Sequence, residues 1–159
     1  MNVYKQVLFQ NINKLLSLYN IDNFSNTYGY ADREFWGWKI KDFSNATLQG
    51  GGHSLSIALK LNVFEGYQKE HILEVINSAI LAVEKISAKN GSVVEAYPGE
   101  NSFCVTALVA FDVLSAIKYL DNDLTVNQKD KYFDIIRPLV GFITKHGEEH
   151  AIISNHLAT

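Results

Sequence analysis

An asparagine and a histidine next to each other have the most direct catalytic potential in this sequence. Asn155 and His156 stand in the string Ile153-Ser-Asn-His-Leu-Ala158. At the start of a helix that opens into a funnel, the amide and the imidazole can hydrogen-bond a substrate carboxylate and make the neighbouring C–H bond more acidic. Histidine can also act as the base. The alternative is structural: Ser154 or Asn155 caps a helix, and His156 packs with its hydrogen bonds satisfied. Spacing alone leaves both interpretations open.

A block of aromatic residues interleaved with charged ones is a second candidate for binding. Its members are Tyr28, Tyr30, Trp36 and Trp38, together with Asp32, Arg33 and Lys39. Flat aromatic faces with a polar fringe suit the rings of carbohydrate, which stack on them while hydroxyl or carboxylate groups bind the fringe. The alternative is that both tryptophans fill the wall of a helical core and that Asp32 and Arg33 form a local ion pair.

A glycine-rich junction precedes His53. The run Gly50-Gly-Gly-His53 has no preceding strand pattern and no following Lys-Ser/Thr pair, so a phosphate-binding loop is not predicted. We expect the glycines to let backbones approach closely at the start of a helix. We expect His53 to point into a funnel, where it either contacts substrate or packs.

A second junction contains strong turn signals, Asn90-Gly91 and Tyr97-Pro98-Gly99-Glu100. Tyr97, Glu100 and Asn101 come directly before a helical pattern and are candidates to line the same cleft as His53. Glu95 and Glu100 would form the carboxylate pair of a glycosidase if their separation in space allowed it.

Metal and thiol chemistry find little support in the sequence. His146-Gly-Glu-Glu-His150 formally matches a zinc-protease pattern, but Gly147 interrupts the helix that this geometry needs. Cys104 lies in an apolar helical pattern and is expected in the core. We therefore predict no metal site and no cofactor.

Composition sets the class of protein. The 159 residues are the length of one ordinary domain, and Lys+Arg 14 against Asp+Glu 17 gives a net charge of -3 without a basic block. A phosphate backbone or an anionic lipid surface is therefore not the expected partner. A single cysteine, no signal-peptide pattern and no membrane-length apolar run predict a cytoplasmic protein.

The apolar spacing is close to 3.6 residues almost throughout and predicts an all-α fold. The connection over 21–46 breaks this period. The expected helices run from Val3 to about Tyr19, from near His53 to before Asn62, from Glu70 to about Ser87, from Ser102 to Leu120, and from Asn127 to about His146, the last bent or restarted at Pro138. The helix over 102–120 is apolar on most faces and is expected to lie deep in the molecule.

Loop-to-helix junctions recur at intervals of about fifty residues, near His53, near 101–103 and near 155–156. One antiparallel helical hairpin per interval indicates an α/α toroid, in which the inner helices are parallel and their N-termini open on one face. We expect residues 1–159 to form a single helical domain that is the N-terminal part of a larger ring. The alternative is a complete small helical bundle.

The string Ser154-Asn-His-Leu-Ala158 resembles the helix start of the heparinase II/III-like and related alginate-lyase toroids. The segments 30–49 and 97–103 are similar to bacterial toroid proteins associated with surface polysaccharides. The resemblance implies that Asn155 and His156 take the carboxylate-neutralising and base roles in a polysaccharide β-elimination. Those lyases also use a tyrosine as acid or base, and no tyrosine of this chain is assigned to that role.

The sequence thus predicts a carbohydrate-active protein that acts on or binds an acidic polysaccharide, lyase-like if it is catalytic. Asn155 and His156 are the predicted reactive pair. The predicted cleft is lined by His53, Trp36, Trp38, Tyr97, Glu100 and Asn101. The alternative from a different class is a non-catalytic helical scaffold that holds a partner protein or associates with itself through the open face of the toroid. A terpenoid-type toroid is disfavoured because no aspartate-rich metal motif is present.

Overall fold

The structure is a computed structural model that describes residues 2–31, 45–64, 66–95 and 99–149. Within these ranges the secondary structure is helical, with three isolated β-bridges and no β-strand. The helices are α1 (Val3–Leu16), the short 3₁₀ helix η1 (Gln49–Gly51), α2 (Gly52–Lys60), α3 (Lys69–Ile86), α4 (Phe103–Tyr119) and α5 (Val126–Ile143). The predicted all-α class is confirmed.

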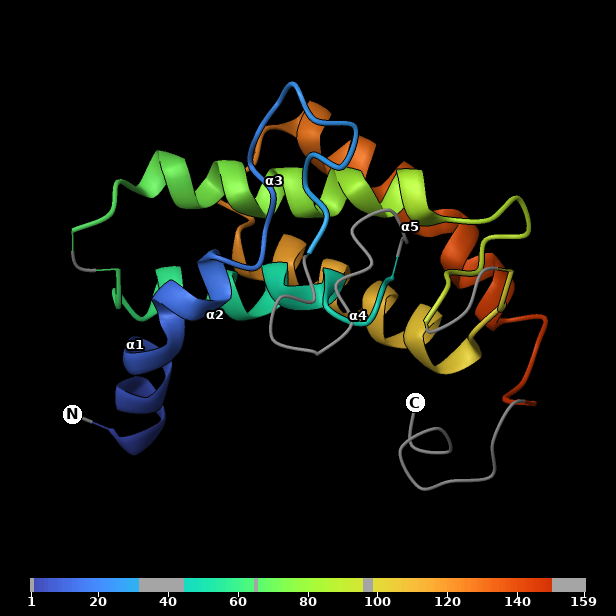
Figure 1. The fold of residues 1–159 in the computed structure, drawn as a ribbon, viewed down its shortest axis with the longest axis horizontal. Helices are drawn as coiled ribbons and strands as arrows, with labels where there is room; N and C mark the ends of the chain where they lie inside the picture. The colour runs from blue at the N-terminus through green and yellow to red at the C-terminus, as the bar shows by residue number, and fades with distance from the viewer. Residues whose placement is uncertain (1, 32–44, 65, 96–98, 150–159) are drawn as a thin grey trace.

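The helices form two antiparallel hairpins that lie against each other (Figure 1). α2 is followed by α3 in the opposite direction, and α4 is followed by α5 in the opposite direction. α2 also packs against α4, and the two run the same way along the molecule. A ring would require parallel inner helices of this kind, and the ring itself stays a prediction.

Local capping explains where α4 and α5 begin. The Ser102 hydroxyl accepts a hydrogen bond from the Val105 backbone N–H, which satisfies one of the free donors at the start of α4. Thr125 and Gln128 form a capping box at the start of α5. α5 continues as one helix through Pro138 to Ile143, so of the two predicted outcomes, a bend or a restart, the restart is wrong. Pro138 is exposed, so water can hydrogen-bond the backbone carbonyl that the proline leaves without an N–H donor.

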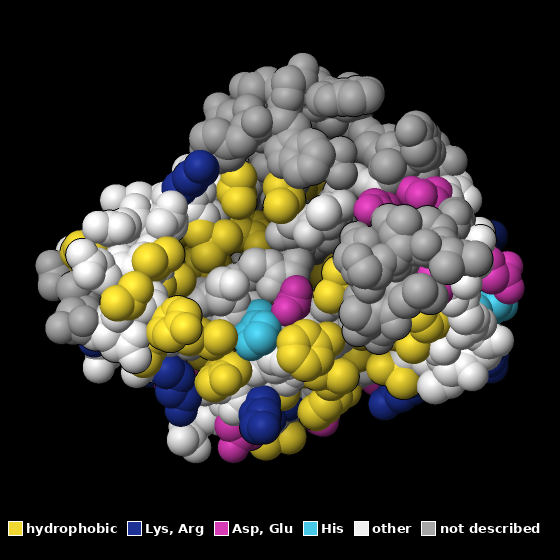
Figure 2. All heavy atoms as spheres, turned by 90° about the horizontal axis from the view of Figure 1, so that it is seen from below, with side chains coloured by type: hydrophobic (Ala, Val, Ile, Leu, Met, Phe, Trp, Pro, Cys, Tyr) yellow, Lys and Arg dark blue, Asp and Glu magenta, His cyan; other side chains and the backbone are white. Residues whose placement is uncertain are grey.

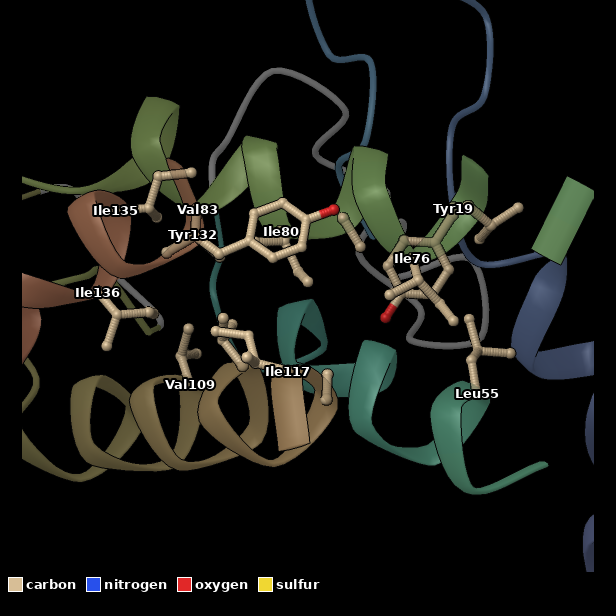
Figure 3. Close-up of a cluster of buried hydrophobic side chains, with 14 of the residues drawn as sticks. Tyr19, Leu55, Ile76, Ile80, Val83, Val109, Ile117, Tyr132, Ile135 and Ile136 are labelled. Atoms are coloured by element: carbon tan, nitrogen blue, oxygen red, sulfur yellow. The ribbon is translucent and has the colours of Figure 1, made fainter. Parts of the chain in front are cut away.

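The core lies between α3 on one side and α2 and α4 on the other. Figure 3 shows Ile76, Ile80 and Val83 of α3 pointing toward Val109 and Ile117 of α4. Each fully buried aliphatic side chain of this size stabilises the fold by about 1.5–3 kcal/mol. α3 contributes nine buried residues and α1 only Ile12, so α3 is the central helix and α1 is held weakly.

Tyr132 of α5 is the largest fully buried side chain among the described residues. Its hydroxyl donates to Asn77 Oδ1 at 2.7 Å, which satisfies the phenol at the edge of the core. Burial raises the pKa of Tyr132 to about 12.

α4 is not as deep as its apolar sequence predicts. Leu108, Phe111 and Leu114 are 45%, 61% and 39% exposed and recur every three residues, so they form one uncovered stripe. Other faces of α4 are buried against α2 and α5. Cys104, near the start of the helix, is buried, as predicted. None of the helices in the described ranges is both long and apolar enough to cross a membrane.

The Gln49 side chain of η1 hydrogen-bonds both to the segment that follows α1 and to α3. Its Nε2 donates to the carbonyls of Gly29 at 2.7 Å and Ala79 at 2.8 Å, and its Oε1 accepts from the Ala31 N–H at 3.1 Å. The side chain is 2% exposed, so these bonds replace the water that would otherwise solvate the amide. Gln49 thereby fixes where η1 and the start of α2 lie.

Candidate functional site

His53 and Asp112 form a side-chain pair between α2 and α4. His53 is the second residue of α2, and Asp112 lies in the middle of α4, 59 positions later. His53 Nδ1 and Asp112 Oδ1 are 3.0 Å apart, and the two side chains are 20% and 29% exposed. An imidazole hydrogen-bonded to a carboxylate and still in contact with solvent is an arrangement that can move protons.

The second ring nitrogen of His53 is the one available for chemistry. Nε2 has no hydrogen-bond partner among the described residues, and it is not one of the buried polar atoms left unsatisfied there. It therefore contacts solvent. With Asp112 ionised, Nδ1 carries the ring proton and donates a hydrogen bond to the carboxylate, which leaves the Nε2 lone pair facing outward.

Two aromatic rings of α4 flank the imidazole. Tyr119 stacks on His53 with ring centroids 5.7 Å apart, and Phe111 meets it edge-on at 5.6 Å. Both rings are exposed. On the face drawn in Figure 2, a histidine and an acidic side chain lie side by side among hydrophobic side chains. The pair thus lies within an apolar surface rather than in a charged one.

Two glycines allow the acidic side chain and a buried tyrosine to come close to η1. A Cβ on Gly50 would lie 1.9 Å from Asp112 Oδ2, and a Cβ on Gly51 would lie 2.1 Å from the Tyr19 hydroxyl oxygen. Close approach was predicted at these glycines, and it occurs, but the neighbours are side chains and not the backbones that were expected.

Tyr19 supports the turn beneath the pair. Its hydroxyl donates to the Leu48 carbonyl at 3.0 Å. Burial raises the pKa of Tyr19 far above its usual value, although the nearby Gly51 backbone N–H lowers it, and the Asp112 charge raises it further. Tyr19 is therefore a neutral structural donor and not a base.

The electrostatic state of Asp112 reflects two opposing effects. Partial burial raises the pKa of Asp112, while the hydrogen bond from His53 and the charge of that ring lower it. Burial is the larger effect. His53 is therefore what makes an ionised carboxylate tolerable at this depth.

Glu100 and Asn101 bind groups of their own loop. Asn101 Oδ1 accepts from Ser92 Oγ at 2.7 Å and from Asn90 Nδ2 at 3.2 Å. Glu100 Oε2 accepts from the Glu95 backbone N–H at 3.2 Å. Asp112 lies nine positions after Phe103 in α4, which is about 14 Å of helix, so this loop is not next to His53. The structure does not bring these two predicted cleft residues to the His53 pair.

The two described tyrosines of the aromatic block lie against the helical core. Tyr30 packs on the core, and burial raises its pKa. The Lys85 ammonium lies 5.9 Å from the centroid of the Tyr28 ring. Both contacts are internal, so neither ring is at the His53 pair.

Other predicted site residues lie outside the described residues. They are Trp36, Trp38, Tyr97, Asn155 and His156, with Asp32, Arg33 and Lys39 of the aromatic block and His150 of the zinc-like string.

The described ranges contain no group of three or more His, Cys, Asp or Glu side chains placed to hold a metal ion. His146 stacks on Phe142, with ring centroids 4.5 Å apart.

The sequence analysis did not identify Asp112 as a candidate site residue. One signal for it exists: it is the single acidic residue in the otherwise apolar helix Phe103–Tyr119. A partly buried carboxylate in the middle of such a helix requires a partner, but nothing in the sequence indicates that the partner is His53.

No protein-family model, curated protein or solved structure matches this chain.

Proposed function

We propose that this chain is a cytoplasmic carbohydrate-active protein that acts on or binds an acidic polysaccharide, by β-elimination if it is catalytic. The observation that carries the proposal is the His53–Asp112 pair, set between two aromatic rings on an accessible surface. The resemblance of Asn155 and His156 to the helix start of polysaccharide lyases gives the substrate class.

The surface around His53 and Asp112 carries groups of the kind that β-elimination requires. In β-elimination a base removes the proton on the carbon next to the sugar carboxylate, a carbon–carbon double bond forms, and the glycosidic C–O bond breaks as its oxygen takes up a proton. The aromatic faces of Phe111 and Tyr119 offer the apolar contact that the C–H face of a sugar ring needs. The pair brings no positive charge of its own when the imidazole is neutral. In this proposal Asn155 and His156 neutralise the substrate carboxylate.

The test incubates the protein with alginates, hyaluronan or heparan sulfate and measures formation of the unsaturated uronide product by its ultraviolet absorbance. We expect one polymer to be cleaved and His156→Gln or Asn155→Ala to abolish cleavage. His71→Gln is the matched control, because His71 stacks on Tyr67 far along the chain from these groups. Affinity electrophoresis in gels containing the same polymers covers the binding-only form. The proposal is refuted if none of these polymers is cleaved and none of them retards the protein.

A second candidate is a helical interaction domain, and the uncovered stripe of α4 favours it. Next to the stripe, a groove of about 600 Å³ lies between α4 and α5. Its lining combines apolar residues (Leu114, Phe133, Ile136 and Val140) with charged ones (Asp130, Asp134 and Arg137). Apolar surface of this kind on a helical pair commonly contacts another protein chain.

The oligomeric state tests this second candidate. If the groove is an interface between copies, sedimentation velocity will show concentration-dependent association that Phe133→Lys abolishes. Phe24→Lys is the control, since Phe24 is 95% exposed on the loop after α1. A monomer at every concentration would count against self-association.

A further inference from the structure

The sequence analysis placed His53 in the predicted cleft but did not assign it the role of a base. We infer that His53 Nε2 is the proton acceptor of a catalytic site and that Asp112 is the positioning residue that holds the ring. This inference rests on the proposed function for its substrate and on the structure for its geometry.

The first step is the tautomer. A carboxylate accepts hydrogen bonds and donates none, so the 3.0 Å contact between Asp112 Oδ1 and His53 Nδ1 places the ring proton on Nδ1. Nε2 is then an unprotonated nitrogen with a lone pair, which is the form that a general base requires. The bond to Asp112 also stabilises the imidazolium that forms when Nε2 takes the substrate proton.

The second step is rigidity. The ring of His53 is held by Tyr119 on one face and by the edge contact with Phe111, in addition to the bond to Asp112. Asp112 itself packs closely against Gly50, because a Cβ at that position would lie 1.9 Å from Asp112 Oδ2. A base fixed on three sides needs little reorganisation when the substrate arrives.

The third step concerns which part of a substrate fits. With a neutral imidazole, the only formal charge of the pair is the Asp112 carboxylate, and no Lys or Arg of the described residues forms an ion pair with it. A substrate carboxylate placed directly on His53 would be repelled by Asp112. The site therefore takes the uncharged C–H side of a uronide ring, lying on Phe111 and Tyr119, while the sugar carboxylate points away to be neutralised elsewhere.

The proton balance is simple. Nε2 accepts the proton from the carbon next to the carboxylate, the electron pair of that C–H bond becomes the new double bond, and the glycosidic oxygen leaves with the bonding pair. The proton on Nε2 is returned to solvent, or to the departing oxygen, before the next cycle. No oxidant, reductant or cofactor is required.

The first experiment does not depend on activity. In the ¹⁵N spectrum of the histidine side chains of the whole chain, we expect His53 as the Nδ1–H tautomer. Asp112→Leu removes the acceptor and should shift the ring toward the Nε2–H form, whereas Asp112→Asn keeps an acceptor oxygen and should retain most of the wild-type tautomer. An Nε2–H tautomer in the wild-type protein overturns the inference.

The second experiment measures catalysis on whichever polymer is cleaved. His53→Gln should lower kcat by about 100-fold or more with little change in KM, since a base acts in the transition state. Asp112→Asn should lower kcat less than Asp112→Leu, and His71→Gln should change neither constant. Wild-type kcat in His53→Gln would overturn the inference even if the polysaccharide assignment held. If no polymer is cleaved, the proposed function fails, and the tautomer alone decides whether His53 is a positioned base.

Discussion

Asp112 is an acidic side chain inside an apolar helix, and its contact with His53 links the two residues energetically. The pKa of Asp112 is raised by burial and lowered by His53, so His53 influences the ionisation of Asp112. A raised pKa means that the folded state binds this proton more tightly than the unfolded chain does. The stability gained from it is fully present below the unfolded pKa and is lost as the pH rises through the folded pKa.

His53→Ala should therefore raise the pKa of Asp112 further. The substitution removes the hydrogen bond and the charge that lower it and leaves the burial that raises it. The carboxyl ¹³C shift of Asp112 measures the pKa directly. The loss of unfolding free energy with rising pH should extend to higher pH in this variant. The same titration in His71→Ala should match the wild type, and an unchanged Asp112 pKa in His53→Ala would contradict the expected coupling.

The glycines of η1 provide a second prediction at the level of single residues. Gly51→Ala would press a methyl group onto the Tyr19 hydroxyl, and Gly50→Ala would displace the Asp112 carboxylate. We expect each to destabilise the fold by about 1–3 kcal/mol. Gly52→Ala is the internal control, because its Cβ would meet Ile76 at an ordinary 3.6 Å. Thermal unfolding of the three variants measures the difference, and equal stabilities would show that the close approach carries no cost.

Among the elements, η1 depends most on a single side chain. Gln49 satisfies two carbonyls and one amide that belong to the connection and to α3. Because these groups are buried, their hydrogen bonds cannot be replaced by water without opening the structure.

Gln49→Leu should destabilise the protein by about 2–3 kcal/mol, since it leaves the buried Ala79 carbonyl without this donor. Urea unfolding of the variant gives the value. Gln10→Leu, on the exposed side of α1, supplies the comparison and should stay within about 0.5 kcal/mol of the wild type. A loss in Gln10→Leu as large as that in Gln49→Leu would mean that the hydrogen bonds are not the cause.

The elements themselves were largely predictable from apolar periodicity. The expected helices from Glu70 to Ser87 and from Ser102 to Leu120 each end within one residue of α3 and α4. The first helix was placed too long because Tyr19 is buried without being helical: its side chain continues the apolar period after the chain has turned at Ser17.

Contacts between elements were much less predictable. Nothing local to Asp112 or His53 indicates that two residues 59 positions apart become a pair, because that depends on how α2 lies across α4. His53 was identified as a candidate by its place after the glycines, and its partner was not. The prediction that α4 lies deep in the molecule was wrong for a related reason. An apolar sequence shows that a helix face can be buried but not that a neighbour covers it.

At the scale of the whole molecule, stability is unevenly distributed. α3 lies at the centre of the core with nine buried residues, whereas α1 stands at one end of the molecule (Figure 1) and buries only Ile12. Helices with few buried contacts open at lower free-energy cost than those in the core.

Native-state hydrogen exchange should resolve this gradient. We expect the amides of α1 to exchange fastest among the five α-helices and those around Ile76 and Ile80 of α3 to exchange only on global unfolding. The denaturant dependence of exchange distinguishes the two cases, because local fraying is nearly independent of denaturant. Equal protection of α1 and α3 would show that the helices unfold as one unit.

The buried phenols of Tyr19 and Tyr132 give the molecule a built-in optical reporter. Both have raised pKa values, that of Tyr132 at about 12, so the folded chain cannot ionise them when its exposed tyrosines do. Since the unfolded chain ionises near pH 10, stability should fall as the pH rises from about 10 toward 12. In an alkaline titration followed by phenolate absorbance, Tyr19 and Tyr132 should therefore ionise late and together with the loss of helical circular dichroism. Tyr132→Phe should remove one of them from this late step, and a single smooth titration of all eight tyrosines would mean that both rings reach solvent in the native state.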